Sequence, residues 1–265
     1  MIRAMIFDLD GVLVQTEKLK ARAYALAVQQ IRNLPEPDTQ ASEAYREVVG
    51  AQREVTSRHV MDKLGLEGEL RPLMAQYGAS EPWQALTAIR YQIYDKMISD
   101  PEVIRDNQWP YTVDLLQVAK ETSCLTALTT LSKRKDVLHV IRSLGIEPLL
   151  NVVLTAEDVS KGKPDPEIYL LAAERLRVPP EECLVLEDSV NGIKAAQSAG
   201  MNVVAIATPF TNASIHDHGI IQEAWIVHEP EKVTEVVRQR INEHGRTAHR
   251  GEAVKNKGGE QWRLV

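Results

Sequence analysis

The sequence has few cysteines, few aromatic residues and no long apolar run. Of its 265 residues only two are cysteines, Cys124 and Cys183, and aromatic residues account for 5%. The two cysteines are too far apart in the sequence for the short spacing typical of metal sites, and one pair cannot supply a disulfide framework for a chain of this size. Because disulfide-poor proteins are typical of reducing compartments, we expect a cytoplasmic protein. No apolar stretch approaches the roughly 18 residues of a membrane span, and Met1 leads into a short strand-like run instead of a signal peptide. We therefore expect no membrane partner.

Positive charge is scarce outside the end of the chain. Thirty-one lysines and arginines against 37 aspartates and glutamates give a formal net charge of −6. Residues 238–265 hold seven basic and three acidic residues, or +4, which leaves 24 basic and 34 acidic residues, or −10, for the rest. Residues 1–237 therefore carry enough negative charge to repel a phosphate backbone, which argues against nucleic-acid binding. A small anionic substrate would need locally concentrated positive charge or a metal ion.

Short continuous apolar runs recur along the chain and indicate an α/β protein. Runs of this length are typical of strands buried on both faces of a parallel sheet. The expected strands are 4–7, 125–130, 152–155, 183–186, 203–208 and 224–227. Between the later runs, apolar residues repeat at helical spacing, and Asp165 and Pro166 have the pattern of a helix N-cap and first residue. The sequence predicts a doubly wound, Rossmann-like α/β domain with a mainly parallel sheet.

Residues 16–105 interrupt this α/β pattern. Helical periodicities follow the first strand in place of a second apolar run, with breaks at 35–38 and at Gly65 and Gly68. We therefore predict an α/β core formed by residues 1–15 and 106–245, with an all-helical domain of residues 16–105 inserted after the first strand. Residues 246–265 combine glycine and charge with little apolar content, which favours a mobile tail.

Polar residues gather just after the predicted strands. Because ligands of open parallel sheets bind beyond the carboxyl ends of the strands, these residues are expected to share one edge. They are Asp8, Asp10 and Gly11 after the first strand, Thr130 and Ser132 after the second, Lys161 and Lys163 after the third, and Glu187 and Asp188 after the fourth. Carboxylate oxygens suit Mg²⁺, and the lack of clustered cysteine or histidine among these residues argues against zinc. The sequence thus predicts a Mg²⁺ site at this edge.

Four segments at these strand ends resemble the four motifs of the haloacid dehalogenase superfamily. They are Asp8-Leu9-Asp10-Gly11-Val12, Thr130, Gly162-Lys163-Pro164-Asp165-Pro166, and Leu186-Glu187-Asp188-Ser189 followed by Gly192. The resemblance covers the chain from Met1 to about Thr208, and the helical insertion resembles that family's mobile cap domain. More narrowly, the chain is similar to the branch that contains β-phosphoglucomutase and small sugar-phosphate phosphatases.

The resemblance implies phosphoryl-transfer chemistry. Asp8 would attack phosphorus and form an aspartyl-phosphate. Asp10, kept protonated by its neighbours, would donate a proton to the leaving oxygen and then activate a water molecule. Thr130 and Lys163 would bind the phosphoryl group, with Lys161 as the alternative to Lys163. The residues expected to hold Mg²⁺ are Asp8, Asp10 through its carbonyl oxygen, Asp188, and Glu187 as a ligand or as a partner of the ligands.

The resemblance also implies a small phosphorylated metabolite, most simply a sugar phosphate, as the substrate. The candidate substrate contacts are Gly11, Thr16, Lys20, Gly50, Arg53 and Ser132. Residues 50–56 resemble the loop with which mutases of this branch contact the distal part of a sugar phosphate. Lys20, however, stands where the mutase typically has a histidine. A phosphatase is therefore the first hypothesis, and a phosphomutase and a binding protein without turnover are the alternatives. The sequence does not determine the oligomeric state, and a monomer is the default expectation.

Overall fold

Six parallel strands form the centre of the molecule. The computed structural model describes residues 1–122 and 124–252, with side chains described up to residue 245. The strand order is β3-β2-β1-β4-β5-β6, and every neighbouring pair is parallel. The strands are β1 (Ala4–Phe7), β2 (Leu125–Thr129), β3 (Val152–Leu154), β4 (Cys183–Glu187), β5 (Asn202–Ile206) and β6 (Ile226–Val227). The predicted α/β class with a parallel sheet is confirmed.

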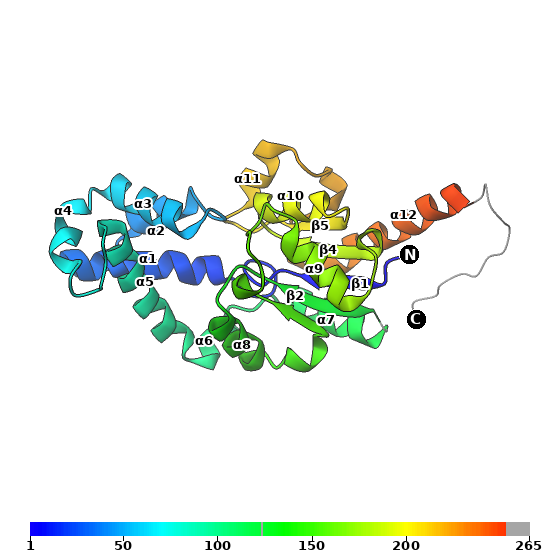
Figure 1. Cartoon of the computed structure of the whole chain (residues 1–265), viewed down its shortest axis with the longest axis horizontal. Coiled ribbons are helices and arrows are strands. Elements are labelled where there is room, and N and C mark those ends of the chain that lie inside the picture. The colour runs from blue at the N-terminus through cyan, green and yellow to red at the C-terminus, as the bar shows by residue number, and fades with distance from the viewer. Residues whose placement is uncertain (123, 253–265) are drawn as a thin grey trace.

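Helices cover both faces of this sheet, as Figure 1 shows. Side chains of a strand alternate between the two faces, so Met5 and Phe7 join one apolar core while Ala4 and Ile6 join the other. All four are buried, which is why β1 reads as a continuous apolar run. The helices on the first face are α7 (Pro110–Glu121), α8 (Arg134–Ser143) and α12 (Val233–Glu252), and those on the second are α9 (Glu167–Leu176), α10 (Val190–Ser198) and α11 (Asn212–His218).

A helical domain follows β1 and lies at one end of the molecule (Figure 1). Its helices are α1 (Thr16–Arg32), α2 (Thr39–Arg46), α3 (Arg53–Leu64), α4 (Glu67–Leu70) and α5 (Pro82–Ile98), and the short α6 (Pro101–Asp106) leads back to the sheet. These helices share a third apolar core that contains Tyr24, Val60 and Leu86. The two connections to the sheet run side by side, since Gln15 N donates to the carbonyl oxygen of Asn107 at 2.7 Å. We call this domain the cap.

Local differences from the sequence prediction lie at element ends. The helix expected to begin at Pro166 begins at Glu167, and Asp165 Oδ1 accepts from Glu167 N at 3.0 Å. The backbone of α12 continues to Glu252, so the first part of the predicted tail, residues 246–252, is helical, and the remainder of that tail lies outside the described residues. Within the described part of the chain, no helix has the length and apolar content needed to cross a membrane.

Candidate active site

The loop after β1 lies at the centre of the sheet's carboxyl edge. Phe7 pairs with Leu128 of β2 on one side and with Leu186 of β4 on the other. The strand order reverses direction at β1, and such a switch point opens a crevice for ligands. Asp8 is the first residue beyond the strand, and its N–H still donates to the carbonyl oxygen of Leu186 at 3.0 Å. Asp8 is thereby held in the middle of the predicted cluster.

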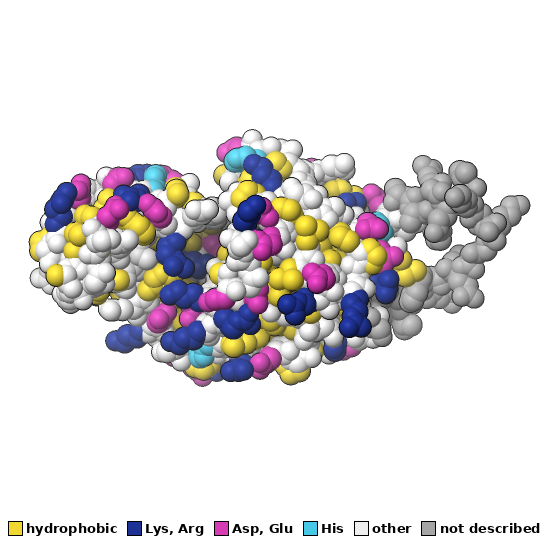
Figure 2. Space-filling view, viewed as in Figure 1, with side chains coloured by type: hydrophobic (Ala, Val, Ile, Leu, Met, Phe, Trp, Pro, Cys, Tyr) yellow, Lys and Arg dark blue, Asp and Glu magenta, His cyan; other side chains and the backbone are white. Residues whose placement is uncertain are grey.

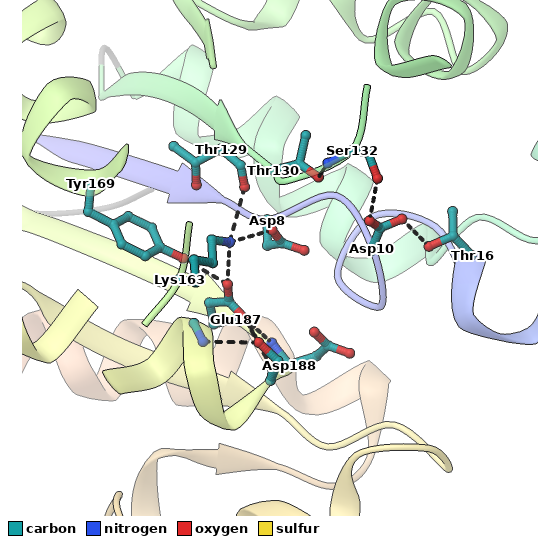
Figure 3. Close-up of polar contacts among 12 residues, drawn as sticks. Asp8, Asp10, Thr16, Thr129, Thr130, Ser132, Lys163, Tyr169, Glu187 and Asp188 are labelled. Carbon is teal, nitrogen blue, oxygen red and sulfur yellow. Dashed lines mark hydrogen bonds and ion pairs between the residues drawn. The ribbon is translucent and has the colours of Figure 1, made fainter. Parts of the chain in front are cut away.

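Lys163 connects the acidic residues of this cluster. Its Nζ lies 2.6 Å from Asp8 Oδ1 and 2.5 Å from Glu187 Oε1, and it also donates to the carbonyl oxygen of Thr129 at 3.3 Å (Figure 3). Burial opposes the charged form, but Asp8 and Glu187 outweigh it and hold the pKa of Lys163 above its usual value. Lys161, the alternative, is exposed, and its Nζ lies 3.8 Å from Asp165. Lys163 is therefore the lysine that reaches the cluster.

Three buried carboxylates at this edge have the geometry of a metal site. Oxygen atoms of Asp8, Glu187 and Asp188 lie within 4.8 Å of one another. Burial and the neighbouring carboxylates raise the pKa of Asp8 and of Asp188 well above the usual range. Asp188 Oδ2 is buried and has no hydrogen-bond partner among the residues that the structure describes. An all-oxygen donor set with an unpartnered buried oxygen fits Mg²⁺, whose charge would relieve this repulsion.

Glu187 differs from the other two carboxylates because its oxygens are already occupied. Oε1 accepts from Lys163 Nζ and from the hydroxyl of Tyr169, at 2.5 and 2.8 Å. Oε2 accepts from the N–H groups of Asp188 and Ser189 and from Ser189 Oγ, each at 3.0 Å. A carboxylate offers about four acceptor positions, and five donors fill them here. Of the two roles open to Glu187, orienting Lys163 and the adjoining loop fits these contacts better than direct metal binding.

The carboxylate of Asp10 is held by three residues that the sequence analysis proposed as substrate contacts. Oδ1 accepts from the hydroxyl of Thr16, and Oδ2 lies 2.7 Å from Ser132 Oγ and 2.9 Å from Lys20 Nζ. Burial alone would raise the pKa of Asp10, but Lys20 and the two hydroxyls outweigh it and lower the pKa below the usual value. The expectation that its neighbours keep Asp10 protonated is therefore contradicted, because the sequence did not show that Lys20 reaches this carboxylate.

Thr130 and two glycines complete the edge. Thr130 is buried, and its Oγ1 accepts from Ser132 N at 3.1 Å, while no acceptor for its own hydroxyl is found among the described residues. Gly11 has a φ of +78°, and a Cβ placed there would lie 2.0 Å from Asp188 Oδ2. A Cβ at Gly192 would lie 1.9 Å from the Glu187 carboxyl group. Only glycine allows these backbones to approach the two carboxylates so closely.

A cleft of about 360 Å³ separates this cluster from the cap. The cap side carries basic and aromatic groups, and Figure 2 shows lysine and arginine side chains on both sides of the hollow between cap and core. The guanidinium of Arg53 lies 5.0 Å from the centre of the Tyr91 ring, and Lys133 Nζ lies 4.2 Å from the same ring. Arg90 also stacks on Tyr91, at 4.6 Å, and its Nε is buried without a partner in the described structure.

The predicted cap loop contacts the core directly. Asn191, in the first turn of α10, donates from Nδ2 to the carbonyl oxygen of Gly50 at 3.0 Å. Gly50 has a φ of +84° and a Cβ there would lie 3.6 Å from the Cβ of Ser189. This contact places the loop that precedes Arg53 beside the start of α10, directly after Asp188. All the predicted site residues except the exposed Lys161 line or adjoin one cleft.

Several residues in the cleft or in contact with its lining were absent from the sequence prediction. Glu17 is buried beside Asp10 and Lys20, and burial raises its pKa to about 7. Tyr169 reaches Glu187 from α9, and Arg90 and Lys133 reach the cleft from α5 and the start of α8. Glu17 could have been predicted from the sequence, because it directly follows Thr16 in the first turn of the helix after the Asp8–Asp10 loop. The other three needed the packing of helices far apart in sequence.

Fold and site together define the class of protein. It has an α/β core with an acidic, lysine-bridged cleft at the switch point of a parallel sheet, and a helical cap inserted after the first strand. A family model of haloacid dehalogenase-like hydrolases matches residues 2–200, and the chain belongs to this family.

Relatives of the chain carry names of phosphatases. The chain is 30% identical over 241 residues to the phosphorylated carbohydrates phosphatase of Thermotoga maritima, and the aligned region covers 90% of this chain and 99% of the relative. It is 28% identical over 229 residues to the validoxylamine A 7'-phosphate phosphatase of Streptomyces hygroscopicus, covering 86% and 93% of the two chains. The solved structure of β-phosphoglucomutase from Clostridium difficile has a TM-score of 0.67 at 24% identity, covering 92% of this chain and 99% of that one, which shows a shared fold.

Proposed function

We propose that this hydrolase is a Mg²⁺-dependent phosphatase that acts on a small phosphorylated metabolite, in particular a sugar phosphate. The observation that carries the proposal is the buried cluster in which Lys163 bridges Asp8 and Glu187, while one oxygen of Asp188 has no hydrogen-bond partner among the residues described. A lysine and a cation-requiring acidic site side by side can bind an anion in an otherwise acidic protein. The names of two relatives, a phosphorylated carbohydrates phosphatase and a validoxylamine A 7'-phosphate phosphatase, support the substrate class.

Asp8 is the proposed nucleophile. Lys163 holds Oδ1 of Asp8 at 2.6 Å and thereby orients the carboxylate, so that its other oxygen can attack phosphorus in line. The resulting aspartyl-phosphate divides one difficult displacement into two easier ones. Lys163 Nζ and the Thr130 hydroxyl are placed to donate to phosphoryl oxygens. When bound by Asp8, the Asp10 carbonyl and Asp188, Mg²⁺ supplies the charge that offsets repulsion between the attacking carboxylate and the phosphate.

Asp10 is the proposed acid and base. In the free protein Lys20, Thr16 and Ser132 stabilise its carboxylate form, which is the form needed to take a proton from the water that attacks the aspartyl-phosphate. A bound phosphate dianion acts in the opposite direction from Lys20, because a nearby negative charge favours the protonated acid. Substrate binding would thus prepare Asp10 to donate to the leaving oxygen, and departure of that group would return it to the carboxylate form.

A phosphomutase is the second candidate, on a specific observation. Arg53 and Lys133 approach the same ring, Tyr91, at the cap side of the cleft, where two cations could hold a second phosphate group. In that reaction the aspartyl-phosphate would return its phosphoryl group to a sugar hydroxyl before water attacks. The ion pair between Lys20 and Asp10 favours hydrolysis, since it keeps a base ready for water.

The deciding experiment measures products from a panel of sugar phosphates. With Mg²⁺ we expect release of inorganic phosphate, loss of that release in EDTA, and a phosphorylated form of the protein that is absent from Asp8→Asn. Incubation with β-glucose 1-phosphate separates the two candidates, because a phosphatase yields free phosphate and a mutase yields glucose 6-phosphate. Equal rates with and without Mg²⁺, or full turnover by a folded Asp8→Asn variant, would remove the proposed mechanism.

A further inference from the structure

A second group of metal-ligating side chains lies outside the cleft, at the far edge of the core. His216 is in the last turn of α11, Glu223 begins the short 3-10 helix Glu223–Trp225, and His228 directly follows β6. His228 Nε2 lies 2.7 Å from Glu223 Oε1, and His216 Nδ1 lies 3.6 Å from Glu223 Oε2. The sequence prediction did not include these residues, and none of them lines the active-site cleft.

The geometry of the three side chains is close to that of a zinc site. One ligand atom from each residue lies within 4.8 Å of the other two. Tetrahedral zinc with bonds of about 2.0–2.2 Å separates neighbouring ligand atoms by about 3.4 Å. His228 Nε2 and His216 Nδ1 lie 2.7 and 3.6 Å from different oxygens of Glu223, so the carboxylate stands between the two rings at distances comparable with this value. The two imidazole rings are nearly parallel, at 7° with centres 5.2 Å apart, so both present their edges to the shared carboxylate. All three side chains are exposed, so they are free to adjust their rotamers around an ion.

The donor types select a different ion from the one in the cleft. The active-site cluster offers only carboxylate oxygens among its side chains, which suit Mg²⁺. Two imidazole nitrogens and one carboxylate suit zinc and similar transition metals, and Mg²⁺ has little preference for nitrogen. Three protein ligands also leave a coordination position open to water. The side chains are 39%, 69% and 40% exposed, so an ion can enter directly from solvent.

We propose that His216, Glu223 and His228 form a second divalent-metal site that binds Zn²⁺ or a similar transition-metal ion. Binding would connect the end of α11 to the chain on either side of β6. Because β6 is a two-residue edge strand, a metal cross-link there would stabilise a part of the core that has few ladder hydrogen bonds of its own. The proposal does not depend on the proposed phosphatase activity.

The test is zinc binding in the presence of excess Mg²⁺, measured by competition with a chromophoric zinc chelator. We expect the wild-type chain to take up one Zn²⁺ ion and to melt at a higher temperature when it is bound. His216→Ala and His228→Ala should each weaken zinc binding by at least about 10-fold. His218→Ala is the matched control: it lies on the same helix, and its Nδ1 contacts the carbonyl oxygen of Ser214 at 2.8 Å. This variant should bind zinc as the wild type does.

A second variant separates this site from the active site. Asp188→Asn removes one carboxylate of the cleft and should leave zinc uptake unchanged if the ion binds at His216, Glu223 and His228. Unaltered affinity in both His216→Ala and His228→Ala, zinc loss confined to Asp188→Asn, or no competition by the wild type would each overturn the proposal. Because the two histidine side chains are exposed, both histidine variants should melt in EDTA at the same temperature as the wild type. This control shows that a loss of zinc binding is not a loss of folding.

Discussion

Replacing Asp188 by asparagine should stabilise the metal-free protein while abolishing its turnover. Asp188 lies within 4.8 Å of Asp8 and Glu187, and the single cation in contact with those two, Lys163, does not contact Asp188 in the described structure. At 4.8 Å and an effective dielectric of about 20, Coulomb's law gives about 3.5 kcal/mol of repulsion for each ionised pair. Protonation and relaxation already relieve part of this, so we expect Asp188→Asn to raise the free energy of unfolding by about 1–2 kcal/mol.

Urea unfolding in EDTA and in Mg²⁺ tests this reasoning. In EDTA the variant should unfold at higher urea than the wild type. In Mg²⁺ at about 100 times its dissociation constant, the wild type should gain about 2.7 kcal/mol and the variant much less, so the order of stability reverses. Asp62→Asn changes an exposed aspartate of the cap and should stay within about 0.5 kcal/mol under both conditions. An Asp188→Asn protein that is less stable than the wild type in EDTA would refute the claim that this carboxylate is held at an electrostatic cost.

Three further substitutions test other parts of the site. Gly11→Ala combines a positive φ with a Cβ 2.0 Å from the Asp188 carboxylate, so we expect a loss of about 1–3 kcal/mol in urea unfolding and weaker Mg²⁺ activation of turnover. Asn191→Ala removes the hydrogen bond to the cap loop, worth about 0.5–1.5 kcal/mol, and should raise KM for a sugar phosphate more than for p-nitrophenyl phosphate. Equal effects on both substrates would contradict the view that this contact positions the cap loop for the sugar. Lys163→Met leaves two buried carboxylates without their cation, so it should lower the free energy of unfolding by about 3–5 kcal/mol and end turnover. Lys161→Met, at an exposed position, should change neither quantity.

The sheet and the carboxylates at its edge were predictable because both depend on local sequence. A strand such as β1 is buried on both faces, so its four residues are all apolar, and the first polar residue after it, Asp8, must lie at the strand's carboxyl end. The same reasoning placed Glu187 and Asp188 at the end of β4. Parallel topology then brought the two ends together, without any knowledge of side-chain rotamers.

The partners of these carboxylates could not be predicted in the same way. Tyr169 lies on the buried face of α9, where an aromatic residue reads as ordinary core, and its hydroxyl reaches Glu187 only through the packing of α9 on the sheet. Arg90 reads as a polar residue on a helix, but three rings of the cap enclose it within 4.6–5.4 Å. The end of α12 was missed because glycine and charge resemble a disordered segment more than a helix.

Lys20 is the residue at which sequence and structure bear most directly on the reaction. It lies on α1, the first helix of the cap, yet its Nζ is 2.9 Å from Asp10 in the core loop, so the ion pair joins the two domains at the point where the cap begins. An enzyme that must keep its aspartyl-phosphate until a sugar turns around in the cleft gains when no ionised carboxylate is available to accept a proton from water during that interval. A hydrolase gains from the opposite arrangement, in which a permanently charged ammonium keeps the carboxylate ionised and ready to accept that proton. Under the proposed mechanism, the lysine at this position therefore supports hydrolysis over transfer to a second hydroxyl, even though Arg53 and Lys133, on either side of the cleft beside Tyr91, could hold a second phosphate.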